Sequence, residues 1–299
     1  MSATRPISAG QTEERIEQDE AEGNVTDATD RLVTLLTLEP VGADAFEAVT
    51  PADGPGRIFG GQVASQALRA ATLTVGADRL PHSLHAYFVR PGRPGSPLRL
   101  DVERTRNGRS FATRAVTASQ GGETILTLSA SFHGVEEGDD WQLPAPLGVP
   151  GPDEVPAVAS PISAFISMQA FEIRPLRATE PGGFPIIHPL WVRTRNRLPD
   201  DPALHACVVA FMSDMGVVGS ARAPRSTLPQ RFMGASLDHA VWFHRPARAD
   251  DWLLFSVEPV TNFGSRALAR GTMHDSKGAL VMSMAQEALL RDAGQVPLP

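Results

Sequence analysis

The second half of this chain repeats the first. When Phe88 is aligned with Phe243, a shift of 155 residues, 12 of the 45 positions from Phe88 to Phe132 are identical without a gap. This period is far longer than that of solenoid repeats, which run to a few tens of residues. The sequence therefore predicts two copies of one domain, related by a pseudo-twofold axis.

Length and composition fit two such domains. The chain has 299 residues, of which 42% are hydrophobic, enough for two cores of ordinary size. Residues 1–30 are acidic and polar with few large apolar side chains, which predicts a disordered tail. Residues 134–165 are dense in proline, glycine and acidic residues, as is typical of an exposed linker. We expect the two domains at residues 31–133 and 166–299.

Hydrophobic periodicity predicts a helix and a run of antiparallel strands in each copy. In the first copy, a small, apolar, proline-free stretch from Gln62 to Leu73 predicts a largely buried helix. Strands are expected around it at 46–49, 85–88, 98–106, 111–120 and 123–133, with a hairpin at Gly121-Gly122. In the second copy we expect a helix after Asp214. Its strands are expected at 171–175, 190–196, 239–244, 252–259, 266–274 and 279–290.

Charge and cysteine content narrow the function classes. The net charge of −7 argues against nucleic-acid binding, which usually requires a basic surface. No apolar run is long enough for a membrane span, and the N-terminus lacks the pattern of a signal peptide. The single cysteine, Cys207, lies in an apolar run and predicts a buried small side chain in a reducing compartment. We therefore expect a cytoplasmic protein.

Five short motifs occur in an order that resembles one enzyme family. They are Arg57-Ile-Phe-Gly-Gly-Gln62, His82-Ser-Leu-His85 with Tyr87-Phe-Val-Arg-Pro-Gly92, Ser213-Asp214, Ser236-Leu-Asp-His239 with Trp242-Phe-His-Arg-Pro246, and Ala285-Gln-Glu287. Together they resemble the acyl-CoA thioesterase II family over roughly residues 32–291. The resemblance implies an α+β double hotdog, in which each of two tandem domains has an antiparallel sheet wrapped around a central helix. It also implies hydrolysis of fatty acyl-CoA to a fatty acid and CoA.

The family's polar triad falls on Asp214, Ser236 and Gln286 in this sequence. The resemblance implies that these residues activate a water against the thioester carbonyl. Without the family resemblance, Asp214 is also typical of a helix N-cap, and Ser236 is typical of a hydroxyl in a turn. Gln286 interrupts an apolar strand, so it requires a buried partner if it faces inward. Such hydrolysis needs neither metal nor cofactor, and we expect neither.

The glycine-rich segment Gly60-Gly61-Gln62 is the predicted substrate-binding segment. Its glycines indicate either a tight turn or a close approach of the backbone to the thioester. His82, His85, His239 and His244 have no spacing typical of a zinc site.

The repeat also predicts that the two copies are not equivalent in chemistry. At a shift of 155, Gln286 falls on Ser131 and Asp214 falls on Phe59. Arg90 and Arg245 are matched residues before proline, where a structural role at a strand end is favoured over phosphate binding. Only the second copy is therefore expected to hold a complete set of catalytic groups.

Two further functions remain open at this level. One is a binding or sensing protein that keeps the acyl-CoA groove without turnover. The other is a lyase of the hydratase hotdogs, although the Asp and His pair of those enzymes is not found. Because single hotdogs bury their sheet faces in oligomers, we also expect a homodimer or a larger homo-oligomer.

Overall fold

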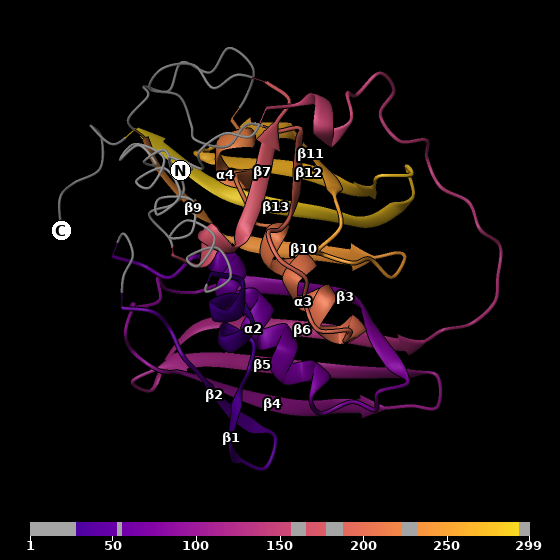
Figure 1. The fold of residues 1–299 in the computed structure, drawn as a ribbon. Coiled ribbons are helices and arrows are strands. Elements are labelled where there is room, and N and C mark those ends of the chain that lie inside the picture. Colours follow the sequence, from indigo (N-terminus) through magenta and orange to yellow (C-terminus); the bar gives the residue numbers. More distant parts are fainter. Residues whose placement is uncertain (1–27, 53–55, 157–165, 178–187, 223–231, 293–299) are drawn as a thin grey trace, which may run out of the picture.

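The computed structural model of the protein describes residues 28–52, 56–156, 166–177, 188–222 and 232–292. Within these ranges, 13 strands form one antiparallel sheet (Figure 1). The strand order is β1-β2-β4-β5-β6-β3-β10-β13-β12-β11-β8-β7, and β9 pairs with β13. No helix in the described residues is long and apolar enough to cross a membrane.

The first copy contributes seven labelled elements. They are β1 (Glu39–Gly42), β2 (Ala45–Ala48), α2 (Gly60–Thr72), β3 (Arg79–Phe88), β4 (Leu98–Asn107), β5 (Phe111–Gln120) and β6 (Glu123–Gly134). Residues 28–35 are also helical. The predicted disordered tail, residues 1–30, lies outside the described residues except for 28–30, which belong to this helix.

The second copy begins with two short 3-10 helices, Pro152–Glu154 and Ile166–Ala170. Its strands are β7 (Phe171–Pro175), β8 (Leu190–Thr194), β9 (Phe232–Ser236), β10 (Asp238–Phe243), β11 (Leu253–Phe263), β12 (Arg266–Asp275) and β13 (Leu280–Asp292). Its helices are α3 (Pro202–Met212) and the single turn α4 (Val217–Ser220).

The two copies join at the centre of the sheet. β3 of the first copy pairs antiparallel with β10 of the second, and Ala240 lies opposite His85. On either side of this junction the strand orders mirror each other, since β6-β5-β4-β2 corresponds to β13-β12-β11-β8. Helices α2 and α3 pack together on one face of the sheet (Figure 1). The predicted double hotdog is confirmed.

The register of the sheet corrects one predicted correspondence between the copies. His85 pairs with Ser129, and its counterpart Ala240 pairs with Ala285, so the shift in the last strand is 156 (285 − 129) rather than 155. At the shift of 155, all but one of the sequence identities accordingly lie before the hairpin. The counterpart of Gln286 is therefore Ala130, and the assignment to Ser131 was wrong by one residue. A one-residue offset places a side chain on the opposite face of a strand.

The main helix of the second copy also differs from the prediction. The long helix α3 precedes Asp214, and only the single turn α4 follows it in the described residues. Asp201 is the N-cap residue of α3, because its side chain accepts hydrogen bonds from the backbone N–H groups of Ala203 and Leu204. Pro202 at the first helical position completes a start signal, Asp-Pro, that the sequence contained. The apolar run around Cys207 lies within this helix.

Helix α2 is buried because its sequence is rich in small side chains. All of its residues except Gly60, Arg69 and Thr72 are buried, as predicted. Arg69 forms an ion pair of 2.9 Å with Asp201, which links α2 to the start of α3. Cys207 on α3 is fully buried, and burial raises the pKa of its thiol to about 12, so it packs as a small apolar group.

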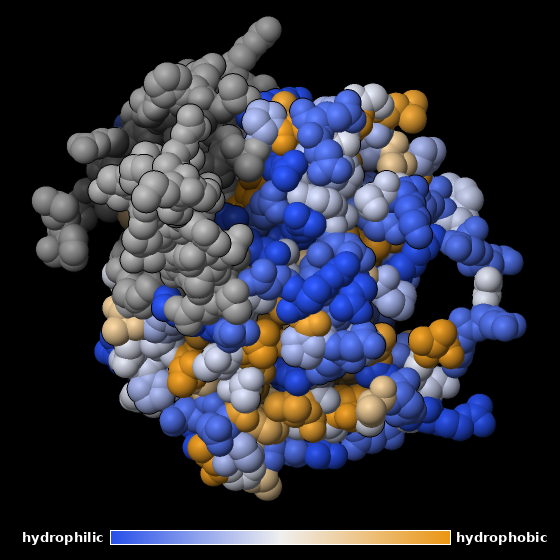
Figure 2. All heavy atoms as spheres, viewed as in Figure 1, coloured by the Kyte–Doolittle hydropathy of each residue, from blue (hydrophilic) through white to orange (hydrophobic). Residues whose placement is uncertain are grey.

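The segment after β6 is held against the second copy by polar contacts. The Gln142 side chain donates to the Gly278 carbonyl and accepts from the Leu280 N–H, both over 2.8 Å. Asp140 pairs with Arg245. On the face shown in Figure 2, apolar residues form separate patches among polar ones.

Candidate active site

Asp214 follows Ser213, the C-cap residue of α3. Its side chain contacts the N-terminus of α2, which belongs to the other copy. Asp214 is 6% exposed, and its Oδ2 accepts a 2.8 Å hydrogen bond from the backbone N–H of Gly61. The first N–H groups of a helix have no partner within the helix and carry partial positive charge, so they favour a carboxylate. The N-cap interpretation of Asp214 was therefore wrong: the carboxyl binds the N-terminus of a helix in the other copy.

Close approach explains the two glycines that open α2. A Cβ atom on Gly60 would lie 2.8 Å from Oδ2 of Asp214, and one on Gly61 would lie 2.6 Å from the Phe211 carbonyl oxygen. Neither distance is tolerated by a side-chain carbon. The tight-turn interpretation does not apply, since both residues are helical, and the close approach is to Asp214 and to α3.

Ser236 and Gln286 lie beside this carboxyl. The Ser236 hydroxyl donates to Oδ1 of Asp214 over 3.4 Å and accepts a 2.8 Å hydrogen bond from Nε2 of Gln286. The Gln286 amide also acts on Asp214, because it lowers the pKa of that carboxyl. The three residues are 22 and 50 positions apart in sequence, yet the pairing of β9 with β13 brings Ser236 opposite Ala288, two residues from Gln286.

Burial dominates the electrostatics of Asp214. It raises the pKa of the carboxyl to about 6, because a charged carboxylate loses its hydration there. The hydrogen bonds from Gln286, Gly61 and Ser236 and the charge of Arg57 act in the opposite direction. A carboxyl of this kind is ionised at neutral pH and is a stronger base than an exposed aspartate.

The sequence missed the residues behind Gln286. His239 and Ser213 are both fully buried, and each ring nitrogen of His239 faces one partner. Nδ1 lies 2.6 Å from Oε1 of Gln286, and Nε2 lies 2.7 Å from Oγ of Ser213. The signal was present, because His239 shares the inward face of β10 with Val241, which is also buried.

A cavity of about 640 Å³ opens at these residues. Its side chains with polar or charged groups are Asp214, Ser236, Arg57 and Arg90, and Gly60 also lines it. Its apolar lining includes Ile58, Phe88, Leu126, Met168, Val217 and Leu289. Of the predicted substrate-binding segment, Gly61 and Gln62 are not among the residues that line it. A mostly apolar cavity with a few polar groups suits a ligand with one reactive polar group and an apolar chain.

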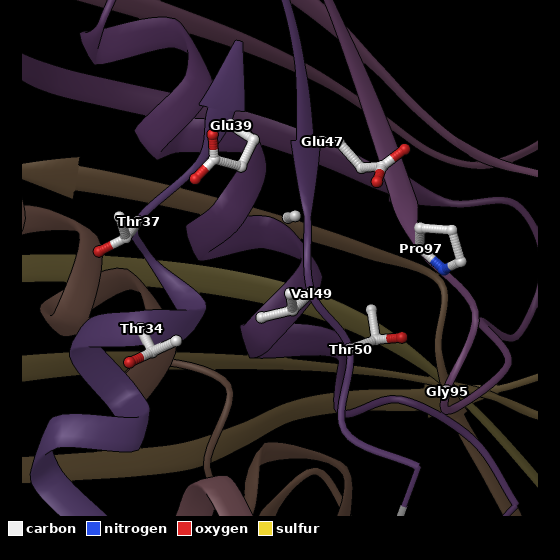
Figure 3. A pocket seen from close by; sticks show the side chains of 9 residues that line it. Thr34, Thr37, Glu39, Glu47, Val49, Thr50, Gly95 and Pro97 are labelled. Carbon is white, nitrogen blue, oxygen red and sulfur yellow. The ribbon is translucent and has the colours of Figure 1, made fainter. Parts of the chain in front are cut away.

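A second cavity, of about 330 Å³, shares no lining residue with the first. It lies where β1 and β2 meet the helical residues 28–35 (Figure 3). Three threonines, Thr34, Thr37 and Thr50, and the glutamates Glu39 and Glu47 are among its lining residues. The two glutamates lie opposite each other in the β1–β2 ladder.

The other histidines and the matched arginines have separate structural partners. His82 contacts Ser131, His85 contacts Asp238, and His244 contacts Ser283. Arg90 donates to the Thr124 carbonyl and Arg245 to that of Leu280, which are counterparts at the shift of 156. These hydrogen bonds agree with the structural role favoured for the two arginines, and Arg90 also lines the main cavity.

Comparisons with known proteins agree with this arrangement. Residues 50–133 match the family described as the acyl-CoA thioesterase N-terminal domain, and residues 165–289 match the family described as acyl-CoA thioesterase. Human acyl-coenzyme A thioesterase 8 is 35% identical over 288 residues, covering 89% of this chain and 90% of that protein. Acyl-CoA thioesterase 2 of Haemophilus influenzae is 33% identical over 283 residues, covering 89% and 99%.

Solved structures include a similar fold. The crystal structure of the acyl-CoA thioesterase II TesB2 from Mycobacterium marinum has a TM-score of 0.75 and 37% sequence identity. The match covers 88% of this chain and 99% of that one. With relatives at this identity over most of both chains, the protein belongs to the acyl-CoA thioesterase II family.

Proposed function

We propose that this protein hydrolyses fatty acyl-CoA to a free fatty acid and CoA. The observation that carries the proposal is the buried Asp214 in a cavity lined mostly by apolar residues. The apolar lining suits an acyl chain, and the carboxyl of Asp214 suits the chemistry of the thioester. The family membership of the chain and the names of its relatives support the same reaction.

In this proposal Asp214 is the general base. It removes a proton from a water that attacks the thioester carbonyl carbon, and the bond to the CoA sulfur then breaks. Ser236, which lines the cavity beside Asp214, holds that water, and the amide of Gln286 supports Ser236 by donating to its hydroxyl. Gly60 lies on the cavity wall at the N-terminus of α2, where the helix end favours the negative charge that develops on the carbonyl oxygen.

A panel of acyl-CoAs of different chain length tests the reaction. The protein is incubated with each substrate and a thiol reagent that reports free CoA. Stoichiometric excess of released thiol over enzyme supports hydrolysis. Tight binding without thiol release would instead support the binding or sensing function. Loss of the double bond from an enoyl-CoA without thiol release would support a lyase.

We also propose that the protein assembles with itself through the outer face of its sheet. Tyr87 and Trp242 are counterparts in the two copies, and they are 56% and 45% exposed on the adjacent central strands β3 and β10. Exposed aromatic residues grouped on a sheet are typical of an interface. Light scattering at micromolar concentration should give twice the chain mass or more, and the double variant Tyr87→Arg, Trp242→Arg should give a smaller species. A monomeric wild-type protein would contradict this proposal.

A further inference from the structure

His239 makes the only side-chain contact to the amide oxygen of Gln286 among the described residues. Its Nδ1 lies 2.6 Å from Oε1 of Gln286 inside the fold, and neither side chain is exposed to solvent. Neither His239 nor Gln286 lines the cavity, whereas Ser236 and Asp214 do. Any effect of His239 on the chemistry must therefore act through Gln286 and its hydrogen bond to Ser236.

Hydrogen-bond accounting fixes how the Gln286 amide is oriented. Its neighbour Ser236 directs the single hydrogen of its hydroxyl to Asp214, so that hydroxyl can only accept from Gln286. Only the amide nitrogen of Gln286 can donate to it. The amide oxygen must then face His239, and Nδ1 of the imidazole must carry a hydrogen to donate to it.

The remaining ring nitrogen has a partner of matching type. With its hydrogen on Nδ1, the neutral ring presents a lone pair at Nε2, where the Ser213 hydroxyl donates over 2.7 Å. The same hydroxyl lies 2.8 Å from the Ala210 carbonyl oxygen, so its hydrogen is shared between the two acceptors. Burial favours the neutral ring, since it lowers the pKa of His239 to about 4. The titratable neighbours of the ring are Asp238 and His85.

The repeat supplies an independent argument. The register of the sheet makes Leu84 the counterpart of His239 and Ala130 the counterpart of Gln286. Leu84 and Ala130 lie opposite each other in the β3–β6 ladder, and both are buried. The polar pair is thus replaced as a unit by an apolar pair in the copy that lacks the carboxylate.

We propose that His239 is a positioning residue, whose Nδ1–H group holds the amide of Gln286 with its nitrogen toward Ser236 and Asp214. This inference rests on the proposed hydrolysis. Without the donor, the amide can rotate by half a turn and place its oxygen against the Ser236 hydroxyl. That orientation loses the hydrogen bond that holds Ser236 with its hydrogen toward Asp214.

Two substitutions separate this role from a purely structural one. His239→Leu reproduces the residue of the first copy and removes the donor. His239→Asn places an amide N–H close to the position of Nδ1. His82→Leu is the matched control. His82 lies in β3, next to β10, contacts the Ser131 hydroxyl through its ring and does not line the cavity.

The first test is the pH profile of turnover in the intact protein. His239→Leu should lower kcat by about 10- to 100-fold with little change in KM, as expected when a reacting group is misplaced. Its acid limb should move to higher pH, since Asp214 loses a hydrogen bond that favours its charged form, while the charge of Arg57 is unchanged. His239→Asn should restore most of kcat and the original limb.

The second test does not depend on activity. The ¹⁵N spectrum of histidine-labelled protein, assigned by comparison with His239→Asn, should show the neutral tautomer with hydrogen on Nδ1. A hydrogen on Nε2, or a His239→Leu variant with the kcat and acid limb of His82→Leu, would overturn the inference. Those results leave the proposed hydrolysis intact, whereas a wild-type protein without thiol release would refute the hydrolysis itself.

Discussion

The backbone N–H of Gly61 donates a 2.8 Å hydrogen bond to Oδ2 of Asp214. The two residues belong to different copies of the repeat, so a helix start of the first copy holds the carboxyl of the second. The candidate site is therefore composite. Its carboxyl, hydroxyl and amide come from the second copy, and the backbone donor and much of the apolar wall come from the first.

Replacing Gly61 with alanine should disturb this contact between the copies. The new Cβ would lie 2.5 Å from Cε1 of Phe59 and 2.6 Å from the Phe211 carbonyl oxygen. We expect the free energy of unfolding to fall by about 1–3 kcal/mol, the usual effect of overpacking, and kcat to fall with it. Gly138→Ala is the matched control, since nothing lies within 4 Å of its Cβ. Urea denaturation and turnover of both variants check this, and equal behaviour would contradict it.

Gln286 and Ser131 should differ sharply in their effect on turnover. Gln286→Ala removes the amide beside Asp214 and should lose most activity. Ser131→Ala should retain most of it, because Ser131 contacts His82 and its strand neighbour Ala130 occupies the position equivalent to Gln286. Both proteins should be folded by circular dichroism. Equal losses would mean that both copies contribute polar groups to the reaction.

The pH dependence of kcat/KM should report the ionisation of Asp214. The proposed base acts only when ionised, and burial raises its pKa to about 6. Activity should therefore be constant above about pH 7 and fall about tenfold per pH unit well below pH 6. A profile that stays flat down to pH 4.5 would show that no group with a raised pKa is required.

Ionised Asp214 should also destabilise the fold at neutral pH. Its pKa rises from 3.8 to about 6 on folding, so the destabilisation grows between those values as pH increases and is complete above them. The difference corresponds to at most about 3 kcal/mol. Asp214→Asn should accordingly be more stable than wild type at pH 8, and the two should converge near pH 4. Denaturant unfolding at the two pH values measures this. A variant that is less stable than wild type at pH 8 would contradict the claim that the ionised carboxyl destabilises the fold.

Much of the fold was predictable because local patterns agreed with the repeat. The strands β5, β6 and β7 lie within one residue of their predicted bounds, since alternating polarity and glycine turns mark them clearly. Helix α3 was not predicted, because the continuous apolar run around Cys207 has no period that separates a helix from a buried strand. Strand β9 was also missed.

The candidate triad was predicted from resemblance, and its environment was not. Sequence spacing alone could not show that Asp214 meets Gly61, because that contact spans 153 residues and depends on how the two copies pack. The error at Ser131 has a local cause. A one-residue shift at the hairpin is invisible without strand pairing, yet it decides which side chain faces inward.

The most direct test of the account is the turnover of Asp214→Asn with an acyl-CoA substrate at pH 8. Asparagine keeps the size of the side chain and an acceptor for Gly61, but it cannot take a proton from water. The account predicts that kcat falls about 100-fold or more, while acyl-CoA binding, measured by calorimetry, persists. Turnover near the wild-type value in a folded, substrate-binding variant would remove Asp214 from the mechanism and contradict the account.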